Sequence, residues 1–213
     1  MSHSVLIIDD HDIVRFGLET LIASQADLHL AGSAASLSQG LALIEQTRPD
    51  LVISDMAVGD SSGLDTVRAV VQAQAPNPVL VVSVQDEMLY GEQVLSLGAR
   101  GYLMKETAYA SVIPAVQAVL AGELWVSQRL ASKMMNRLLR RTRVAAEPAE
   151  AAPSLTGREL QVLELLKTGK TTKEIAAALV LSARTVDIHR ANIKKKLGLR
   201  TGAELIAFAS HRL

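Results

Sequence analysis

Four short apolar runs in the first half of the sequence are each followed by polar residues that could take part in chemistry. Asp9 and Asp10 follow VLII, Asp55 follows LVIS, Ser83 follows PVLVV and Lys105 follows GYLM. Crowded carboxylates raise one another's pKa unless a cation lies among them, and their hard oxygen atoms suit Mg²⁺. A carboxylate can also be the nucleophile that forms an acyl phosphate, a reaction that needs mainly positioning and charge neutralisation. These side chains therefore indicate phosphoryl transfer, provided that the fold brings them together.

The elements that must position these residues are predicted from the alternation of apolar runs with amphipathic segments. Over roughly the first 120 residues this alternation predicts βα units. Runs that are apolar at every position, such as residues 80–82, are typical of strands covered on both faces in a parallel sheet. We expect helices near residues 13–24, 37–47, 63–74, 87–97 and 110–121. The prediction is an α/β domain with a five-stranded doubly wound parallel sheet, in which ligands bind at the carboxyl ends of the strands.

This set of residues resembles the receiver domain of bacterial two-component response regulators, over roughly residues 4–121. The resemblance implies a flavodoxin-like strand order and a phosphoryl group that Asp55 accepts from a sensor histidine kinase. Such a domain is a phosphoacceptor regulator, with at most self-catalysed phosphotransfer and dephosphorylation. The other implied roles are Mg²⁺ binding by Asp9, Asp10, Asp55 and the backbone carbonyl of Ala57, phosphate binding by Lys105, and switching by Ser83 and Tyr102.

Each of these residues also has an ordinary structural explanation. An Asp pair before a helix is often a cap, a strand-end Asp is often a turn residue, and packing accounts for a half-buried strand tyrosine such as Tyr102. It is the combination of these residue types at successive strand ends that favours the phosphoacceptor interpretation.

A change in composition separates the first domain from the rest of the chain. A helix rich in Arg and Met is predicted from Ser127 to about Arg143, and residues 144–153, VAAEPAEAAP, have little that could pack in a core. Such a segment is typical of a semi-flexible tether. We therefore expect a receiver domain over residues 1–125, a helical extension and linker over 126–153, and a second domain over 154–213.

The second domain is predicted to be a small all-α unit of four helices. Three Thr-x-x-Glu segments match the capping box, in which hydroxyl and carboxylate satisfy the backbone N–H groups of a helix start. They are Thr156 with Glu159, Thr171 with Glu174 and Thr201 with Glu204, while Ser182 is a simpler N-cap and Gly169 and Gly198 are helix ends. The predicted helices cover residues 157–168, 172–179, 183–197 and 202–211.

The charge distribution suggests a polyanionic partner for this second domain. Residues 1–128 contain 5 Lys and Arg against 15 Asp and Glu, a formal charge of −10, whereas residues 129–213 contain 17 against 7, a charge of +10. A solvated basic surface is the alternative. Residues 173–197 supply two helices with a tight turn, the pattern of a helix-turn-helix whose second helix enters the major groove of DNA.

In that second helix, Val186, Ile193 and Leu197 can face the core, with His189 near the edge. The outward set comprises Thr185, Asp187, Ile188, Arg190, Ala191, Lys194 and Lys195. Lys and Arg suit DNA phosphates, and Ile188 suits a thymine methyl group.

Residues 155–209 resemble the LuxR-type DNA-binding domain, and together with the receiver they resemble the NarL/FixJ family of response regulators. The resemblance implies binding of double-stranded promoter DNA, as a homodimer on two half-sites. It places Val186 with the outward set, on or beside the DNA-facing surface. Asp187 departs from the basic residue that is frequent at its position: it either costs affinity near phosphates or accepts a hydrogen bond from a cytosine amino group.

The chain has no cysteine, which fits a reducing compartment, and no apolar run long enough to span a membrane. We expect a cytoplasmic protein without a membrane partner.

Three features of the sequence bear on rival functions. Gly59-x-Ser61-x-Gly63 matches the nucleophile elbow of serine hydrolases, but no histidine follows Ser61 in a credible place. Gly169-Lys170-Thr171 lacks the earlier glycine and the strand of a phosphate loop. A DNA-binding regulator that works without phosphorylation remains the alternative.

Two departures from the receiver pattern lie near the predicted pocket. The segment after Asp55, MAVGDSSG, lacks the usual Met-Pro-Gly turn, and Val84 stands after the predicted switch hydroxyl, where receivers usually have a smaller residue. We predict that the branched Val84 side chain restricts access to the phosphoryl group. The decay of phosphorylated protein is then expected to differ between the native chain and Val84→Ala, and identical lifetimes would refute the idea.

Overall fold

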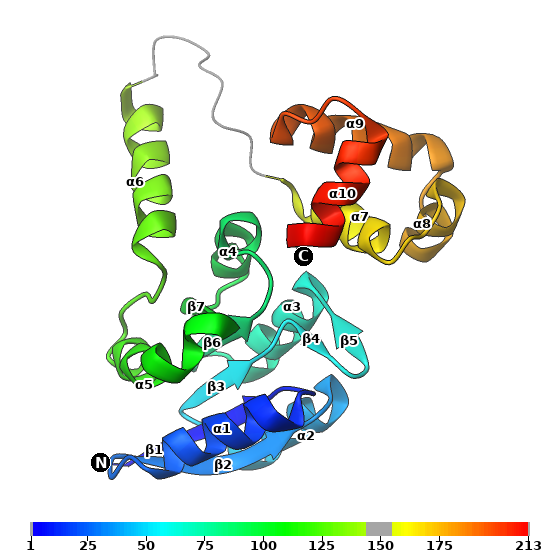
Figure 1. The fold of residues 1–213 in the computed structure, drawn as a ribbon. Helices are drawn as coiled ribbons and strands as arrows, with labels where there is room; N and C mark the ends of the chain where they lie inside the picture. The colour runs from blue at the N-terminus through cyan, green and yellow to red at the C-terminus, as the bar shows by residue number, and fades with distance from the viewer. Residues whose placement is uncertain (1, 144–154, 213) are drawn as a thin grey trace. The chain divides into compact units, whose positions relative to one another are not determined.

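The structure, a computed structural model, describes the backbone of residues 2–143 and 155–212 and the side chains of residues 2–139 and 155–210. These residues form an N-terminal unit built around a sheet and a C-terminal unit of helices (Figure 1). The predicted linker, residues 144–153, lies outside the described residues, so the proposed domain limits stay a prediction.

The N-terminal unit contains a five-stranded parallel sheet with the strand order β2-β1-β3-β6-β7. Its strands are β1 (His3–Ile8), β2 (Leu28–Ala34), β3 (Leu51–Ser54), β6 (Val79–Ser83) and β7 (Gly101–Met104). Every residue of β3 and β6 is buried, as expected of central strands that are covered on both faces. The predicted doubly wound, flavodoxin-like sheet is confirmed.

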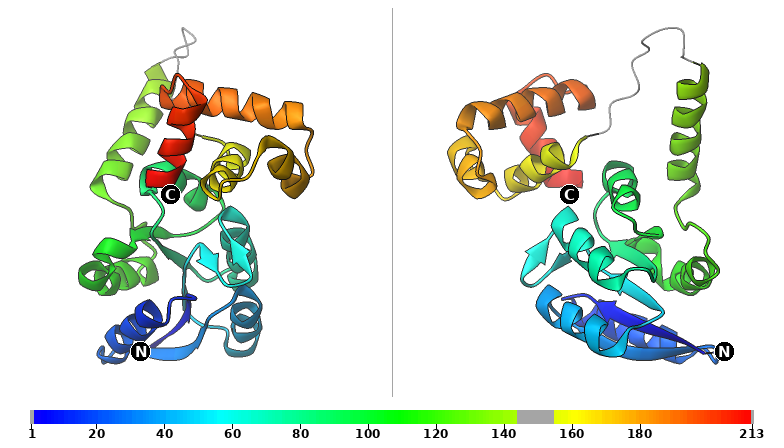
Figure 2. Two further views of the ribbon diagram at one scale, coloured as in Figure 1. Left: turned by 45° about the vertical axis from the view of Figure 1, so that its right-hand side comes forward. Right: turned by 180° about the vertical axis from the view of Figure 1, so that it is seen from behind.

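Helices cover both faces of this sheet (Figures 1 and 2). On one face, α1 (Asp12–Ala23) and α5 (Lys105–Leu120) share a core with the strands. The other face is covered by α2 (Leu37–Thr47), which contacts β1 and β2, and α3 (Leu64–Gln74), which contacts β3 and β6, while α4 (Glu87–Ser96) follows β6 along the chain. Gly40 lets α2 approach β1 closely, because a Cβ atom there would lie 2.5 Å from Ile8 Cδ1.

Two local features differ from the predictions. Helix α5 begins at Lys105, five residues before the predicted start, so no loop separates it from β7. The segment after Asp55 forms a small antiparallel hairpin of β4 (Ala57–Val58) and β5 (Ser61–Ser62). Two-residue strands are too short to produce the alternation on which strand prediction depends.

Beyond the sheet, α6 (Gln128–Arg143) matches the predicted helical extension. The C-terminal unit contains α7 (Gly157–Lys167), α8 (Thr172–Leu179), α9 (Ala183–Leu197) and α10 (Gly202–Arg212), as predicted. Its core consists of buried apolar side chains from all four helices: Leu160, Leu163, Ile175, Val186, Ile193, Leu205 and Ala209.

Capping interactions define the starts of these helices. Both reciprocal hydrogen bonds of the capping box form at Thr156 with Glu159 and at Thr171 with Glu174. The third predicted box forms only in part, because the Glu204 carboxylate accepts from the amide of Arg200 while Thr201 accepts from the amide of Glu204.

Glu159 also links α7 to α9, since its Oε2 lies 2.7 Å from Lys196 Nζ. Burial raises the pKa of the Glu159 carboxyl, but the hydrogen bonds from Lys196 and Thr156 outweigh it, so the pKa is lowered overall. One carboxylate therefore caps a helix and joins two helices.

Within residues 2–143 and 155–212, every helix falls short of the apolar length that crossing a lipid bilayer requires.

Candidate functional site

Strands β1 and β3 bring Asp9 and Asp55 together at the carboxyl edge of the sheet. Ile8 of β1 pairs with Ser54 of β3 in the parallel register. Asp9 and Asp55 directly follow these two residues, so they lie side by side at the ends of neighbouring strands. Both aspartates are almost completely buried, with 1% and 2% of their surface exposed. Two carboxylates in this position require a compensating positive charge.

Lys105 supplies that charge from the first residue of α5. Its Nζ lies 2.6 Å from Asp55 Oδ2 and 2.7 Å from Asp9 Oδ2, and its side chain is 7% exposed. Burial lowers the pKa of Lys105, but the hydrogen bonds to Asp55 and Asp9 outweigh this effect and leave the pKa raised. Lys105 therefore carries its charge at neutral pH and shares it between two acids.

The Asp55 carboxylate is held at both oxygens. Oδ2 accepts from Lys105, and Oδ1 accepts from the backbone N–H of Met56 at 2.6 Å. Burial and the negative charge of Asp9 together raise the pKa of Asp55 by more than the contacts with Lys105 and the amide of Ala57 lower it. The carboxylate is fixed in orientation but costly to keep charged, which are the conditions under which neutralisation by a ligand is favourable.

His11 is a member of this cluster that the sequence interpretation missed. Its Nδ1 lies 2.8 Å from Asp10 Oδ1 and 3.2 Å from Asp9 Oδ1. One potential ligand atom from each of Asp9, Asp10, His11 and Asp55 falls within 4.8 Å of the others. The available signal was its place directly after the aspartate pair, where its backbone N–H also donates to Asp9 Oδ1.

The two predicted switch residues lie on adjacent strands, and both form a hydrogen bond with the backbone of Gln85. Ser83 ends β6 with 1% of its surface exposed, and its Oγ accepts from the backbone N–H of Gln85 at 3.4 Å. Tyr102 in β7 donates from its hydroxyl to the carbonyl of Gln85 at 2.8 Å. Tyr102 is also 1% exposed, and burial raises the pKa of its phenol. Its ring therefore already occupies an inward position.

Ser61, the centre of the hydrolase-like motif, lies in the short strand β5 and not at a strand-to-helix elbow. Its hydroxyl accepts a hydrogen bond from Thr66 at 2.8 Å. This position does not support an activated serine nucleophile.

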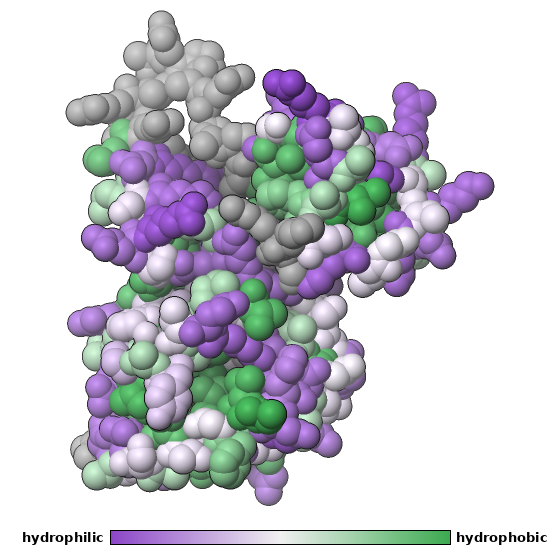
Figure 3. Space-filling model, viewed as in Figure 1, coloured by the Kyte–Doolittle hydropathy of each residue, from purple (hydrophilic) through white to green (hydrophobic). Residues whose placement is uncertain are grey.

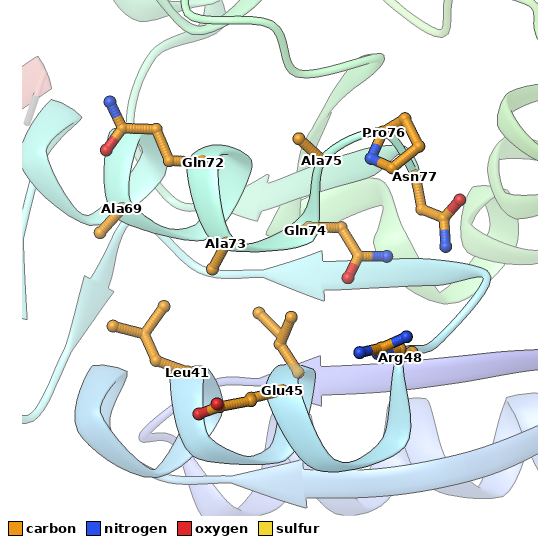
Figure 4. A pocket seen from close by; sticks show the side chains of 11 residues that line it. Leu41, Glu45, Arg48, Ala69, Gln72, Ala73, Gln74, Ala75, Pro76 and Asn77 are labelled. Carbon is orange, nitrogen blue, oxygen red and sulfur yellow. The ribbon is translucent and has the colours of Figure 1, made fainter.

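A hollow between α2 and α3 is separate from the acidic cluster (Figure 4). It is lined by Leu41, Ile44, Glu45, Arg48, Ala69 and Gln72 together with residues 73–77, none of which belongs to the cluster. The hollow is therefore not part of the acidic cluster.

In the C-terminal unit, α8, a short turn and α9 form the predicted helix-turn-helix. Of the outward set, Asp187, Ile188, Ala191 and Lys195 are exposed, and Thr185, Arg190 and Lys194 are partly exposed. Val186 is fully buried, so it packs in the core of this unit and not with the exposed residues of the outward set.

The fold and the acidic cluster thus define a receiver-like phosphoacceptor domain joined to a helix-turn-helix unit. Comparison with family models gives the same two parts: the response regulator receiver domain matches residues 5–117, and the luxR family of bacterial regulatory proteins matches residues 153–209.

Similar proteins extend over almost the whole chain. The transcriptional regulatory protein LiaR of Bacillus subtilis is 33% identical, with 97% of each chain covered. The oxygen regulatory protein NreC of Staphylococcus carnosus is 30% identical, with 96% of this chain and 95% of NreC covered. The chain belongs to the NarL/FixJ family of two-component response regulators, which are transcription regulators.

Solved structures show the same fold. RcsB of Salmonella enterica serovar Typhimurium, bound to the promoter rprA in the presence of phosphomimetic BeF₃⁻, is 20% identical, covers 99% of each chain and has a TM-score of 0.73. The response regulator ChrA of a heme-sensing two-component system is 29% identical, with 98% of this chain and 96% of ChrA covered and a TM-score of 0.50.

The charge balance in the pocket leads to a prediction for Lys105→Met. Removing the ammonium group leaves two buried carboxylates without their cation, so we expect the N-terminal unit to lose about 3 kcal/mol of unfolding free energy at neutral pH in metal-free buffer. Because the folded pKa of Asp55 is raised, its stabilising contribution is present below its unfolded pKa of about 4 and is lost as pH rises through the folded pKa.

The loss of unfolding free energy on raising the pH from 5 to 8 should be larger in Lys105→Met than in the native chain. The reason is that contacts with Lys105 lower the pKa of Asp55, and the variant lacks these contacts. Scanning calorimetry over this range measures it, and Lys105→Arg, which keeps the positive charge, is the control. Parallel pH curves for the native chain and Lys105→Met would contradict the prediction.

Proposed function

We propose that Asp55 is the residue that receives the phosphoryl group, and that its phosphorylation controls how the C-terminal unit binds promoter DNA. The observation that carries the proposal is the environment of Asp55: a buried carboxylate oriented by Met56 and Lys105 at the open end of a parallel sheet. Ligands bind at this edge of doubly wound sheets. The donor would be the phosphohistidine of a sensor kinase.

The donor set of the cluster fits Mg²⁺. Carboxylate oxygens from three aspartates are available, and Lys105 neutralises only part of their charge. We propose that Asp9, Asp10, Asp55 and the carbonyl of Ala57 hold the ion. When bound, Mg²⁺ offsets negative charge on the carboxylates and on the incoming phosphoryl oxygens.

The chain's own residues account for the rest of the transfer. A carboxylate oxygen of Asp55 forms a bond to phosphorus while the bond from phosphorus to the donor's imidazole nitrogen breaks. Lys105 can then pass its ion pair from Asp55 Oδ2 to a phosphoryl oxygen, since a phosphoryl group bonded to Asp55 would lie beside the same ammonium group. We propose that the chain catalyses this step, and the later hydrolysis, only through positioning and charge.

Ser83 and Tyr102 provide a route from the phosphate to the domain surface. A hydrogen bond from the Ser83 hydroxyl to a phosphoryl oxygen would move this residue, and its contact with Gln85 would change. Tyr102 bonds to the same Gln85 and would respond. The charge of the phosphoryl group can in this way shift the loop around Gln85 between two conformations.

We propose that α9 enters the major groove of DNA. The proposed contact residues are those of the outward set that are exposed or partly exposed: Thr185, Asp187, Ile188, Arg190, Ala191, Lys194 and Lys195. A solved structure of two RcsB dimers on two parallel DNAs supports binding as a homodimer. A regulator of promoter DNA works in the compartment that contains the chromosome, so we place it in the cytoplasm.

A surface for the kinase is suggested by large apolar side chains exposed on two adjacent helices. Ile13 and Phe16 on α1 are 89% and 71% exposed, and Tyr109 in the second turn of α5 is 83% exposed. Helices α1 and α5 pack against each other, and both begin at the strand edge that carries the acidic cluster. Figure 3, which has the same view as Figure 1, shows hydrophobic residues on the surface in the region of α1. Exposed apolar patches mark interaction sites.

We predict that Phe16→Ala slows phosphotransfer from the cognate kinase at least about 10-fold, because such anchors contribute about 2 kcal/mol or more to an interface. Labelling by a small phosphodonor such as acetyl phosphate should not change, since the pocket stays intact. The two rates can be compared by gel mobility of the phosphorylated protein, with the exposed Leu30→Ala on β2 as control. An equal loss with both donors would contradict this docking surface.

The central experiment selects operators from random duplexes and measures their affinity for the native chain and Asp55→Ala, with and without acetyl phosphate and Mg²⁺. We expect a change of about 5- to 150-fold in the native chain only, the usual range of coupling between two sites. Mass spectrometry checks that one phosphoryl group is added to the native protein. Equal affinities in all four conditions would favour the phosphorylation-independent alternative.

A further inference from the structure

The proposed DNA-facing surface contains a hydrogen-bonded chain that joins α8 to α9. Arg190 Nη1 donates to Thr172 Oγ1 at 2.7 Å, and Thr172 Oγ1 donates to Asp187 Oδ1 at 3.4 Å. A guanidinium group can only donate and a threonine hydroxyl has one proton. Because Arg190 occupies a lone pair of the hydroxyl, the hydroxyl proton is left for Asp187.

The guanidinium group of Arg190 also lies close to the start of α10. A Cβ atom built on Gly202, the first residue of α10, would lie 4.0 Å from Arg190 Nη2, an ordinary van der Waals distance. Arg190 is therefore only partly exposed. Because Arg190 donates to Thr172, we assign it a positioning role within this set of proposed contact residues.

Asp187 is exposed, and Thr172 contacts only its Oδ1, so Oδ2 is not engaged by this hydrogen-bonded chain. Ala191 lies one helical turn further along the same face, and the adjacent Ile188 is 52% exposed. The part of α9 around Asp187 thus offers one oriented acceptor among apolar groups. The lysines at 194 and 195 follow near the helix end.

An ionised carboxylate accepts hydrogen bonds and donates none. In the major groove, guanine and thymine present acceptors, adenine presents a donor beside an acceptor, and cytosine presents an amino donor. DNA phosphates repel the same carboxylate. The carboxylate therefore lowers the affinity for DNA of any sequence and favours sequences that offer it a hydrogen-bond donor. Cytosine is the base that this group fits best.

We propose that Asp187, oriented by Thr172 and Arg190, selects a cytosine at one position of each operator half-site. Asp187 is the specificity-determining residue, and Thr172 and Arg190 are positioning residues. The inference rests on the proposed function, since it requires that α9 enters the major groove.

The test uses the full chain and sequencing of duplexes selected from a random pool, followed by binding to operators with each of the four base pairs at the selected position. For the native chain we expect a cytosine preference of roughly 5- to 150-fold over the other bases, the usual range for one good base contact. Asp187→Asn should change the preferred base to adenine, because an amide both donates and accepts.

Thr172→Val should reduce the cytosine preference several-fold, and Thr172→Ser, which keeps the hydroxyl, should restore it. A merely structural role would change stability or total affinity without changing the preferred base. Lys195→Met is the matched control, since loss of a phosphate contact weakens binding to all sequences about equally.

The outcomes separate this inference from the proposed function. If the native chain selects an operator but Asp187→Asn keeps the same base preference at every position, the inference is overturned and the function stands. If the native chain selects no operator in either phosphorylation state, the proposed function fails and the inference fails with it.

Discussion

Two buried carboxylates on neighbouring strands repel each other, and the ammonium group of Lys105 makes their proximity possible. Parallel pairing of β1 with β3 fixes the positions of Asp9 and Asp55, because their backbones continue directly from paired residues. Two negative charges therefore repel each other at this edge of the sheet, and the ammonium group of Lys105 offsets them only in part. A divalent metal ion that accompanies a phosphoryl group would offset the remaining negative charge, so the edge is chemically suited to both.

Much of this arrangement could be predicted from the sequence because it depends on local patterns. Buried central strands appear as unbroken apolar runs, and the residues after them must lie at the carboxyl edge. The starts of α7 and α8 were equally predictable, because a capping box involves residues only three apart. The third box shows the limit of the pattern, since Glu204 bonds to the neighbouring amide of Arg200.

Features that depend on how distant segments meet were not predictable in the same way. The contact of Thr172 with Asp187 and Arg190 requires the relative placement of two helices. The place of His11 in the acidic cluster could not be predicted either, because a lone histidine after two aspartates has no distinctive spacing. The inward position of Tyr102 depends on a loop carbonyl that no periodic pattern specifies.

The start of α5 at Lys105, directly after β7, has a mechanical consequence. With no intervening loop, the backbone that carries the ammonium group is anchored on one side by sheet pairing and on the other by helical hydrogen bonds. An exchange of partners at Nζ must then be absorbed by torsions within one side chain or passed directly to the first turns of α5. Pro114, which lacks a backbone N–H, lies further along this helix, so the tight connection to the pocket belongs to the part of α5 that precedes it.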